Sequence, residues 1–271
     1  MKKEPDLFIY LGDIITRGDT RPWNSSFFSL SEPMLSRIPM IGAVGNHETG
    51  DKPSGGPSTY YDYFSSFSHG YIDGSEVIDP RGESYFAMDY GDVRIISLNI
   101  NGDEASPSLE INSAQMNWLD KEIENAGSKW IFILAHVSVY STGYHGRWSA
   151  DKKESVAPIL EKHTSNGKHI IFFSGNCHSF EHLYKSGVHY IRPSVAASNV
   201  REQFKFADQP YSLIWRSLNG FSTVEVSDDG EKVTMISFDK EGQEFYSYEF
   251  NRTEQMQPVC ILRRMMASKN R

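Results

Sequence analysis

The stretch HIIFFSGNCHSFEH, residues 169–182, joins a continuous apolar run to a loop of polar residues. The run Ile170–Phe173 predicts a buried β-strand. Asn176 and His178 follow it, and loops at strand ends are where binding and catalytic residues are usually placed. His178 is therefore a candidate metal ligand. By itself the stretch fits a working metal site, a site with an exchanged ligand at Asn176, or an ordinary loop.

Three other predicted strands end in the same way. The run DLFIYL is followed by Gly-Asp at 12–13, IPMIGAV by GNHE at 45–48, and WIFILA by His136. Strand ends of α/β folds gather at one edge of the sheet. The sequence therefore predicts one cluster that contains Asp13, Asn46, His47, His136, Asn176 and His178.

The rest of the chain alternates predicted strands with helices, which indicates an α/β fold. Helical stretches are expected near 23–36, 112–127 and 150–163, and the segment 49–82 is expected to be a long irregular insertion. From residue 187 onward the chain is rich in short predicted strands. A hairpin is expected at ESYFAMDYGDVRIISLNI, two apolar runs around Tyr-Gly-Asp.

Composition excludes several classes of function. The chain has 271 residues and a net charge of −8, from 27 basic and 35 acidic side chains, and no basic tract that would suit a nucleic-acid groove. Its apolar runs are too short to span a bilayer or to form a signal-peptide core. Two cysteines, Cys177 and Cys260, make neither a disulfide framework nor a thiolate metal cage, although the sequence allows them to pair. No G-x-S-x-G motif supports a serine hydrolase.

The ordered series GD, GNHE, His and G-x-x-H, each behind an apolar strand, strongly resembles the calcineurin-like metallophosphoesterases. The branch with purple acid phosphatases and their bacterial relatives is the most similar. The resemblance covers nearly the whole chain, including WLDKEIE at 118–124 and HVSVYSTGYH at 136–145. It implies a four-layer αββα sandwich of two mixed β-sheets flanked by helices. We expect this domain to span residues 1–252, with 253–271 as a C-terminal tail without an assigned role.

The resemblance also implies a reaction and a set of metal ligands. Members hydrolyse phosphate mono- or diesters with a metal-bridged hydroxide, held between divalent cations about 3.5–4 Å apart. Asp13 matches the bridging carboxylate, His178 matches a ligand of the first metal, and Asn46 and His136 match ligands of the second. The cofactors implied are divalent ions such as Mn, Zn, Fe or Mg, and the partner is a small phosphate ester.

Two further histidines match residues that act on the substrate. His47, directly after Asn46, corresponds to a general acid beside the leaving-group oxygen. His145, nine residues past His136, falls where relatives place a phosphate-orienting histidine, although a surface-loop histidine explains that position equally well. The sequence does not distinguish nucleotides, sugar phosphates, phosphodiesters or phospholipid head groups as substrates.

This chain departs from the family pattern at three points. Relatives begin with a strand that carries a metal-binding Asp, for which no counterpart is present, so we expect the reading frame to be truncated and the first strand to be lacking. Relatives have G-H-x-H where this chain has Gly-Asn176-Cys-His178, so a metal-ligand His is replaced by Asn176. Thr16 occupies the place of a metal-binding Tyr, and iron-tyrosinate colour is therefore not expected.

Two hypotheses of function follow. The first is a metal-dependent phosphoesterase with His47 as general acid. The second is a catalytically impaired or inactive family member that acts as a ligand-binding or interaction protein, and the ligand losses favour it. Oligomeric state and compartment are not set by the sequence, although relatives are often secreted or periplasmic.

Overall fold

The computed structural model describes residues 4–15, 23–49, 60–64, 70–72, 75–77, 85–101, 113–143, 150–196, 198–201 and 209–252. The first half of the chain contains β1 (Phe8–Tyr10), the π-helix η1 (Trp23–Phe28), α2 (Ser29–Leu35), β2 (Met40–Gly42), α3 (Asn46–Thr49), α4 (Tyr60–Tyr63), β3 (Gly70–Ile72), β4 (Ser75–Val77), β5 (Phe86–Tyr90), β6 (Val93–Leu98), α5 (Ser113–Asn125) and β7 (Trp130–Ala135). The second half contains α6 (Ala150–Ser155), α7 (Ala157–Ser165), β8 (Ile170–Ser174), β9 (Phe180–Lys185), β10 (Val188–Pro193), η3 (Gln209–Tyr211), β11 (Ser212–Arg216), β12 (Gly220–Val226), β13 (Lys232–Asp239) and β14 (Glu244–Asn251).

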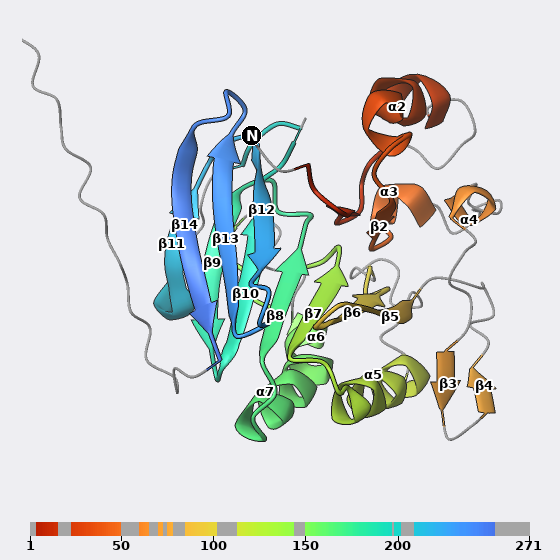
Figure 1. Ribbon diagram of the computed structural model, residues 1–271, viewed down its shortest axis with the longest axis vertical. Helices are drawn as coiled ribbons and strands as arrows, with labels where there is room; N and C mark the ends of the chain where they lie inside the picture. The colour runs from red at the N-terminus through yellow and green to blue at the C-terminus, as the bar shows by residue number, and fades with distance from the viewer. Residues whose placement is uncertain are drawn as a thin grey trace, which may run out of the picture.

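A mixed seven-stranded sheet forms the centre of the molecule, in the order β11-β9-β10-β8-β7-β6-β5 (Figure 1). The strands β10, β8, β7 and β6 run parallel, and antiparallel pairs close both edges of the sheet. Strand β7 is buried along its whole length, as expected for a parallel strand covered on both faces. The carboxyl ends of β7 and β8 therefore lie side by side.

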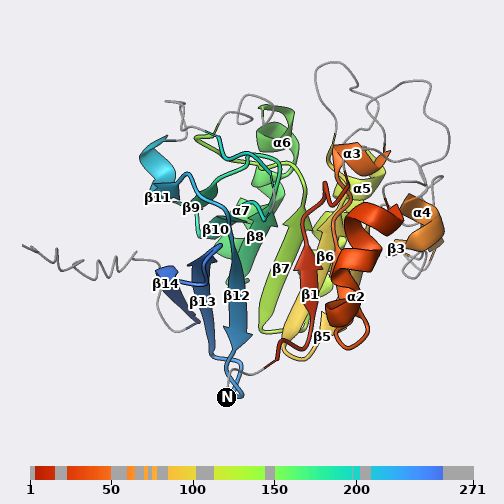
Figure 2. The ribbon, with the colours of Figure 1, turned by 90° about the horizontal axis from the view of Figure 1, so that it is seen from above.

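The second strand layer consists of two pieces. Strands β1 and β2 form a parallel pair, and β12, β13 and β14 form an antiparallel sheet. No strand within the described ranges joins β1 to β12. Figure 2 shows both pieces, in red and in blue, alongside the green strands of the central sheet. Ser97 on β6 donates a hydrogen bond to the carbonyl oxygen of Gly42 on β2, which connects the two layers.

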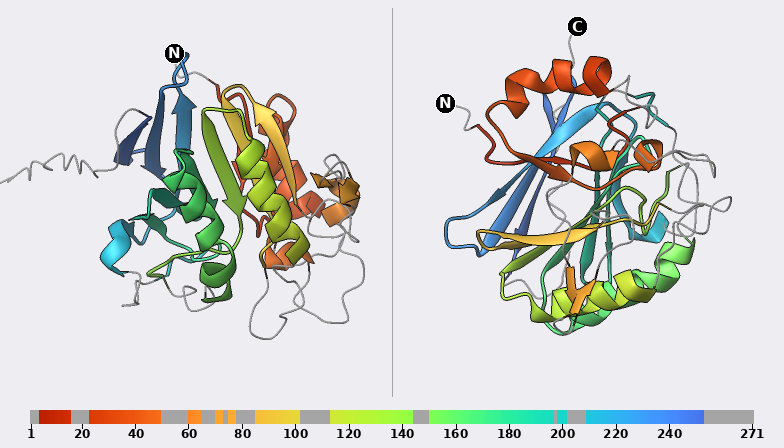
Figure 3. Two further views of the ribbon diagram at one scale, coloured as in Figure 1. Left: turned by 90° about the horizontal axis from the view of Figure 1, so that it is seen from below. Right: turned by 90° about the vertical axis from the view of Figure 1, so that its right-hand side faces the viewer.

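Three hydrophobic cores separate four layers, which Figure 3 shows in side view. One core lies between the central sheet and α5 and α7, and contains Trp118, Leu119 and Leu160. A second fills the space between the strand layers. The third packs η1 and α4 against β1, around the fully buried Trp23. The side chains of β7 alternate between the first two cores, as a strand with period two requires. The α/β sandwich predicted from the sequence is confirmed.

Most predicted elements match the structure, and two segments differ. The hairpin around Tyr-Gly-Asp forms as β5 and β6, with Gly91 at φ +57° in the turn. The helix expected at 150–163 is two helices, α6 and α7. Pro158 lies in the first turn of α7, where its fixed φ and missing N–H are tolerated, so it favours a new helix start at this point. The expected irregular insertion at 49–82 contains α4 and the β3–β4 hairpin. No helix in the described ranges is long and apolar enough to cross a membrane.

Candidate metal centre

The predicted site residues follow the carboxyl ends of four strands. Asp13 lies three residues past β1, Asn46 begins α3 after β2, His136 directly follows β7, and the loop with Asn176 and His178 follows β8. Because β1 pairs with β2 in parallel and β7 with β8 in parallel, each pair of strands delivers its loops to the same edge. The sheet topology therefore presents these side chains from four different segments.

Three donor atoms converge at His136. Its Nε2 lies 3.0 Å from Asn46 Oδ1 and 3.1 Å from Asp13 Oδ2. The opposite nitrogen, Nδ1, donates to the carbonyl oxygen of Leu11 at 2.7 Å. A neutral imidazole protonated at Nδ1 presents a lone pair at Nε2, so a nitrogen, an amide oxygen and a carboxylate oxygen face one point. A backbone carbonyl that fixes the histidine tautomer is typical of metal-ligating histidines.

The electrostatics of this cluster favour a cation. Burial alone would lower the pKa of His136, but the Asp13 carboxylate, together with the Leu11 carbonyl and Glu48, raises it above its ordinary value. Burial likewise would raise the pKa of Asp13, while the His136 ring brings it below its ordinary value. The negative field that stabilises a positive ring would also stabilise a divalent ion. The donor set therefore fits a bound metal.

His47 lies beside this cluster and is accessible to solvent. Its backbone N–H donates to Asp13 Oδ1 at 3.0 Å, and its Nε2 is 3.8 Å from Asp13 Oδ2. The side chain of His47 is 41% exposed, whereas that of His136 is 1% exposed. His136 is thus enclosed within the cluster, while the ring of His47 is open to solvent.

Glu48 organises the two loops that carry Asp13 and Asn46, a role that the sequence analysis missed. The side chain is fully buried and accepts hydrogen bonds from the backbone N–H groups of Asp13 and Gly45, both at 2.7 Å, and of Ile15 at 3.3 Å. Burial, with the nearby Asp13 charge, raises the pKa of Glu48. The sequence signal that could have indicated this role is the position of Glu48 as the last residue of the GNHE motif.

Backbone geometry at these loops is constrained by close approach. Gly12 has φ +82°, and a Cβ there would come within 2.5 Å of His136 Nδ1 and 2.7 Å of the Gly45 Cα. Asp13, Asn176 and His178 adopt positive φ angles of 56°, 59° and 38°, although none is glycine. Such angles cost about 1–3 kcal/mol each and persist where surrounding contacts determine them. Three of the five non-glycine residues with positive φ in the described ranges are thus predicted ligands.

His178 belongs to the second loop of the site. Its Nδ1 donates to the carbonyl oxygen of Asn199 at 3.0 Å and also contacts Ser198 Oγ at 3.2 Å. Burial lowers the pKa of His178, and the Arg201 cation lowers it further. The charge of Asp13 raises the pKa of the ring and that of His136 lowers it, both more weakly than burial.

Asn176 lies in the same loop and is partly buried. The described residues contain no group of three or more His, Cys, Asp or Glu side chains in metal-binding geometry. The converging donors include an amide, that of Asn46. His145 and Thr16 lie outside the described residues, as does Cys260.

The family described as calcineurin-like phosphoesterase matches residues 1–172 of this chain. This is more than half of its length, and the chain belongs to the calcineurin-like phosphoesterase family. The matched range contains Asp13, Asn46, His47 and His136 and ends before His178. The family resemblance inferred from the motifs is thereby confirmed.

Purple acid phosphatases of Arabidopsis thaliana are among its relatives. Purple acid phosphatase 22 is 25% identical over 185 residues, which cover 65% of this chain and 38% of the relative. Probable inactive purple acid phosphatase 27 is 25% identical over 189 residues, covering 66% of this chain and 30% of the relative. The chain thus spans less than half the length of these curated relatives.

Solved structures share the fold. Purple acid phosphatase PPD1 from yellow lupin seeds superimposes with a TM-score of 0.72 at 16% identity, covering 92% of this chain and 47% of that one. GAP50, described as the anchor in the inner membrane complex of Plasmodium, gives 0.64 at 15% identity, over 90% and 78% of the two chains. A dimetal phosphatase from Danio rerio gives 0.55 at 17% identity, over 92% and 84%.

Proposed function

We propose that this chain is a metal-dependent phosphoesterase that hydrolyses phosphate mono- or diesters. The observation that carries the proposal is that Asn46 Oδ1 and Asp13 Oδ2 lie 3.0 and 3.1 Å from His136 Nε2. Membership in a family of phosphoesterases supports the same reaction class. The functional domain is proposed to extend over residues 1–252, and its partner is a small phosphate ester.

Asp13, Asn46 and His136 would hold one ion, with Asn176 as a further ligand from the second loop, and His178 would hold the other ion together with Asp13. Oxygen donors outnumber nitrogen donors in this set, which favours Mn²⁺ or Mg²⁺ over Zn²⁺ or iron. Bound divalent cations supply an activated water and neutralise negative charge on the phosphate. With an amide at position 176 in place of an imidazole, we expect at most one ion to be held tightly.

His47 is proposed as the general acid. Its exposed ring can hold a proton at Nε2 and deliver it to the leaving-group oxygen of a bound ester. Asp13 accepts a hydrogen bond from the backbone N–H of His47 and so fixes the main-chain position from which the His47 side chain extends. His145 is proposed to orient the phosphate, on the basis of its place in the sequence alone.

The alternative is a family member that binds a ligand or partner without catalysis. Asn176 is the observation that favours it, because an amide is a weaker metal ligand than imidazole for zinc or iron. Such a role is compatible with this fold. One relative is named a probable inactive purple acid phosphatase, and one solved structure with this fold, GAP50, is described as an anchor.

Metal binding and turnover, measured together, separate the two functions. Purified chain would be dialysed, loaded with Mn²⁺ or Zn²⁺, and assayed with a chromogenic phosphate ester, beside an Asp13→Asn variant as control. We expect Mn²⁺-dependent turnover that Asp13→Asn removes. Stoichiometric binding of Mn²⁺ without turnover of any ester would favour the non-catalytic role, and two zinc or iron ions retained after dialysis would contradict the metal preference.

A further inference from the structure

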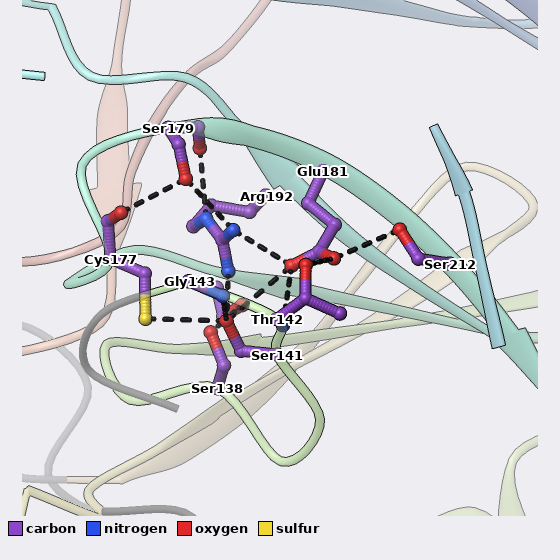
Figure 4. Close-up of polar contacts among 10 residues, drawn as sticks. Ser138, Ser141, Thr142, Gly143, Cys177, Ser179, Glu181, Arg192 and Ser212 are labelled. Carbon is purple, nitrogen blue, oxygen red and sulfur yellow. Dashed lines mark hydrogen bonds and ion pairs between the residues drawn. The ribbon is translucent and has the colours of Figure 1, made fainter. Parts of the chain in front are cut away.

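A buried ion pair lies beneath the second loop of the metal centre. Glu181 on β9 and Arg192 on β10 occupy directly opposed positions of the antiparallel pair, and Arg192 Nη2 lies 2.8 Å from Glu181 Oε2. Their side chains are 0% and 2% exposed. Figure 4 shows this pair at the centre of a network of polar contacts. None of its members is among the predicted site residues.

Arg192 holds the loop that carries His178. Its Nε donates to the carbonyl oxygen of Ser179 at 2.8 Å, and its Nη2 donates to Ser179 Oγ at 2.9 Å. Ser179 Oγ in turn donates to the carbonyl oxygen of Cys177 at 3.0 Å. The residues on both sides of His178 are thus connected to one guanidinium group.

The same pair holds the loop that follows β7 and His136. Arg192 Nη1 donates to Ser141 Oγ at 2.8 Å, and the Thr142 N–H donates to Glu181 Oε2 at 3.1 Å. The Thr142 hydroxyl also donates to Glu181 Oε1. Ser141 Oγ further accepts the N–H of Gly143 at 2.9 Å and contacts Cys177 Sγ at 3.5 Å. The loops after β7 and β8 therefore meet on one ion pair.

We propose that Glu181 and Arg192 are positioning residues that set the place of His178 relative to His136. This inference rests on the proposed metal-dependent function of the site. A buried ion pair is weak evidence for stability, since apolar residues of similar volume often stabilise a core as well. The planar guanidinium instead supplies donors in fixed directions, which reach both loops at once. The positive φ of His178 requires such surrounding contacts to persist.

A matched pair of serine variants tests this role. Ser179→Ala removes a hydrogen bond between Arg192 and the loop that carries Asn176 and His178, here called the metal loop. Ser212→Ala removes a hydrogen bond to the same ion pair from β11, where Ser212 Oγ donates to Glu181 Oε1 at 3.0 Å. A positioning role predicts that only the first change loosens the metal loop. A purely structural role predicts similar effects.

The first measurement is the labelling rate of the Cys177 thiol, which is 1% exposed, in a Cys260→Ser background. Ser179→Ala should speed labelling by about tenfold or more, the change expected when a charge-assisted hydrogen bond is lost from a local opening equilibrium. Ser212→Ala should leave the rate within about threefold of the parent. Unfolding by denaturant, measured in parallel, confirms that labelling occurs from the folded chain. Equal rates for the two variants would overturn the proposal.

The second measurement is Mn²⁺ affinity by titration calorimetry. Ser179→Ala should weaken binding by about 10–100-fold, the usual effect of losing an outer contact of a metal ligand, and Ser212→Ala should not. If Ser179→Ala does not fold, Thr142→Val replaces it, since it removes the hydroxyl contact from the other loop to Glu181. A parent chain that binds no Mn²⁺ would overturn the proposed function, while the labelling rates would still decide whether the ion pair positions the loop.

Discussion

Asp13, Asn46 and His136 form one half of the candidate metal centre, and Asn176 and His178 form the other. In the first half the side chains are placed by loops packed backbone against backbone, with Gly12 close to both His136 and Gly45. In the second half one loop is held by hydrogen bonds from side chains, mainly that of Arg192 on β10.

The difference teaches that one site can combine two kinds of support. Close backbone contact leaves a ligand few alternative positions, whereas a loop held by side chains depends on each hydrogen bond being made. Asn101, which donates to the carbonyl oxygen of Val44 at 2.7 Å, further fixes the first half to the central sheet. We therefore expect the first half to dominate metal affinity and the second to be adjustable by mutation.

The largest effect is expected at His47. Replacing it by Ala should reduce phosphate-ester turnover by about 10²–10⁴-fold, the usual range for a general acid, because the exposed ring beside Asp13 would no longer donate a proton. Steady-state kinetics at saturating Mn²⁺ measures the change, with His169→Ala, directly before the amino end of β8, as the histidine control. A loss below about threefold would remove His47 from the mechanism.

The next effect compares a ligand from each half. His136→Ala should weaken Mn²⁺ binding by more than about 100-fold, beyond the usual effect of outer contacts, because Nε2 is one of the three converging donors. His178→Ala should weaken it less, since this histidine belongs to the loop held by side chains. Calorimetric titration of both variants gives the ratio. Equal losses would show that the two halves do not differ in strength.

A smaller gain is expected from Asn176→His in the second half. An imidazole at this position restores a nitrogen ligand and should strengthen Zn²⁺ binding by about tenfold, and Mn²⁺ binding less. Asn166→His, at the end of α7, is a surface control of the same chemistry. If the substitution weakens binding of both ions, Asn176 is itself the better ligand. The expectation that Asn176 replaces a stronger histidine ligand is then wrong.

The smallest effect concerns two histidines on the strands that support the second half, the buried His182 and the half-buried His189. His182 Nε2 lies 2.9 Å from His189 Nδ1, and the groups around them include Tyr184, Tyr246 and Tyr248. Burial lowers the pKa of His182 well below its ordinary value and that of His189 to about 3. Both rings therefore stay neutral in the folded chain even when the pH falls below the ordinary histidine pKa.

Below about pH 6.5 the unfolded chain binds protons at these rings that the folded chain does not, so the free energy of unfolding falls as the pH falls. At pH 6 the loss should be roughly 1 kcal/mol for each ring. Urea unfolding between pH 8 and pH 5.5 measures it. His189→Gln should remove the contribution of one histidine from the pH dependence of the free energy of unfolding. An unchanged pH dependence would contradict a neutral His189 in the folded chain.

Local sequence predicted the order of the elements and the strand ends that carry the candidate site residues. Apolar runs followed by GD, GNHE, His and GNCH were sufficient to place Asp13, Asn46, His136 and His178 at strand ends, and the structure places them there. The division of 150–163 into two helices was not predicted, because amphipathic spacing continues through Pro158 and does not show where one helix stops. Glu48 was visible as part of a motif, but its hydrogen bonds to two loops were not.

What the sequence determined by itself is the set of strands, the polar residues at their ends and the family, since these depend on neighbouring residues and on motif order. Only the tertiary structure decided which nitrogen of His136 faces Asp13, because that orientation depends on Leu11, 125 residues away. It also decided that Arg192 connects to Ser141, 51 residues away, below the metal loop. Such contacts follow from strand register and layer packing, which bring distant residues together and leave no periodic signal in the chain.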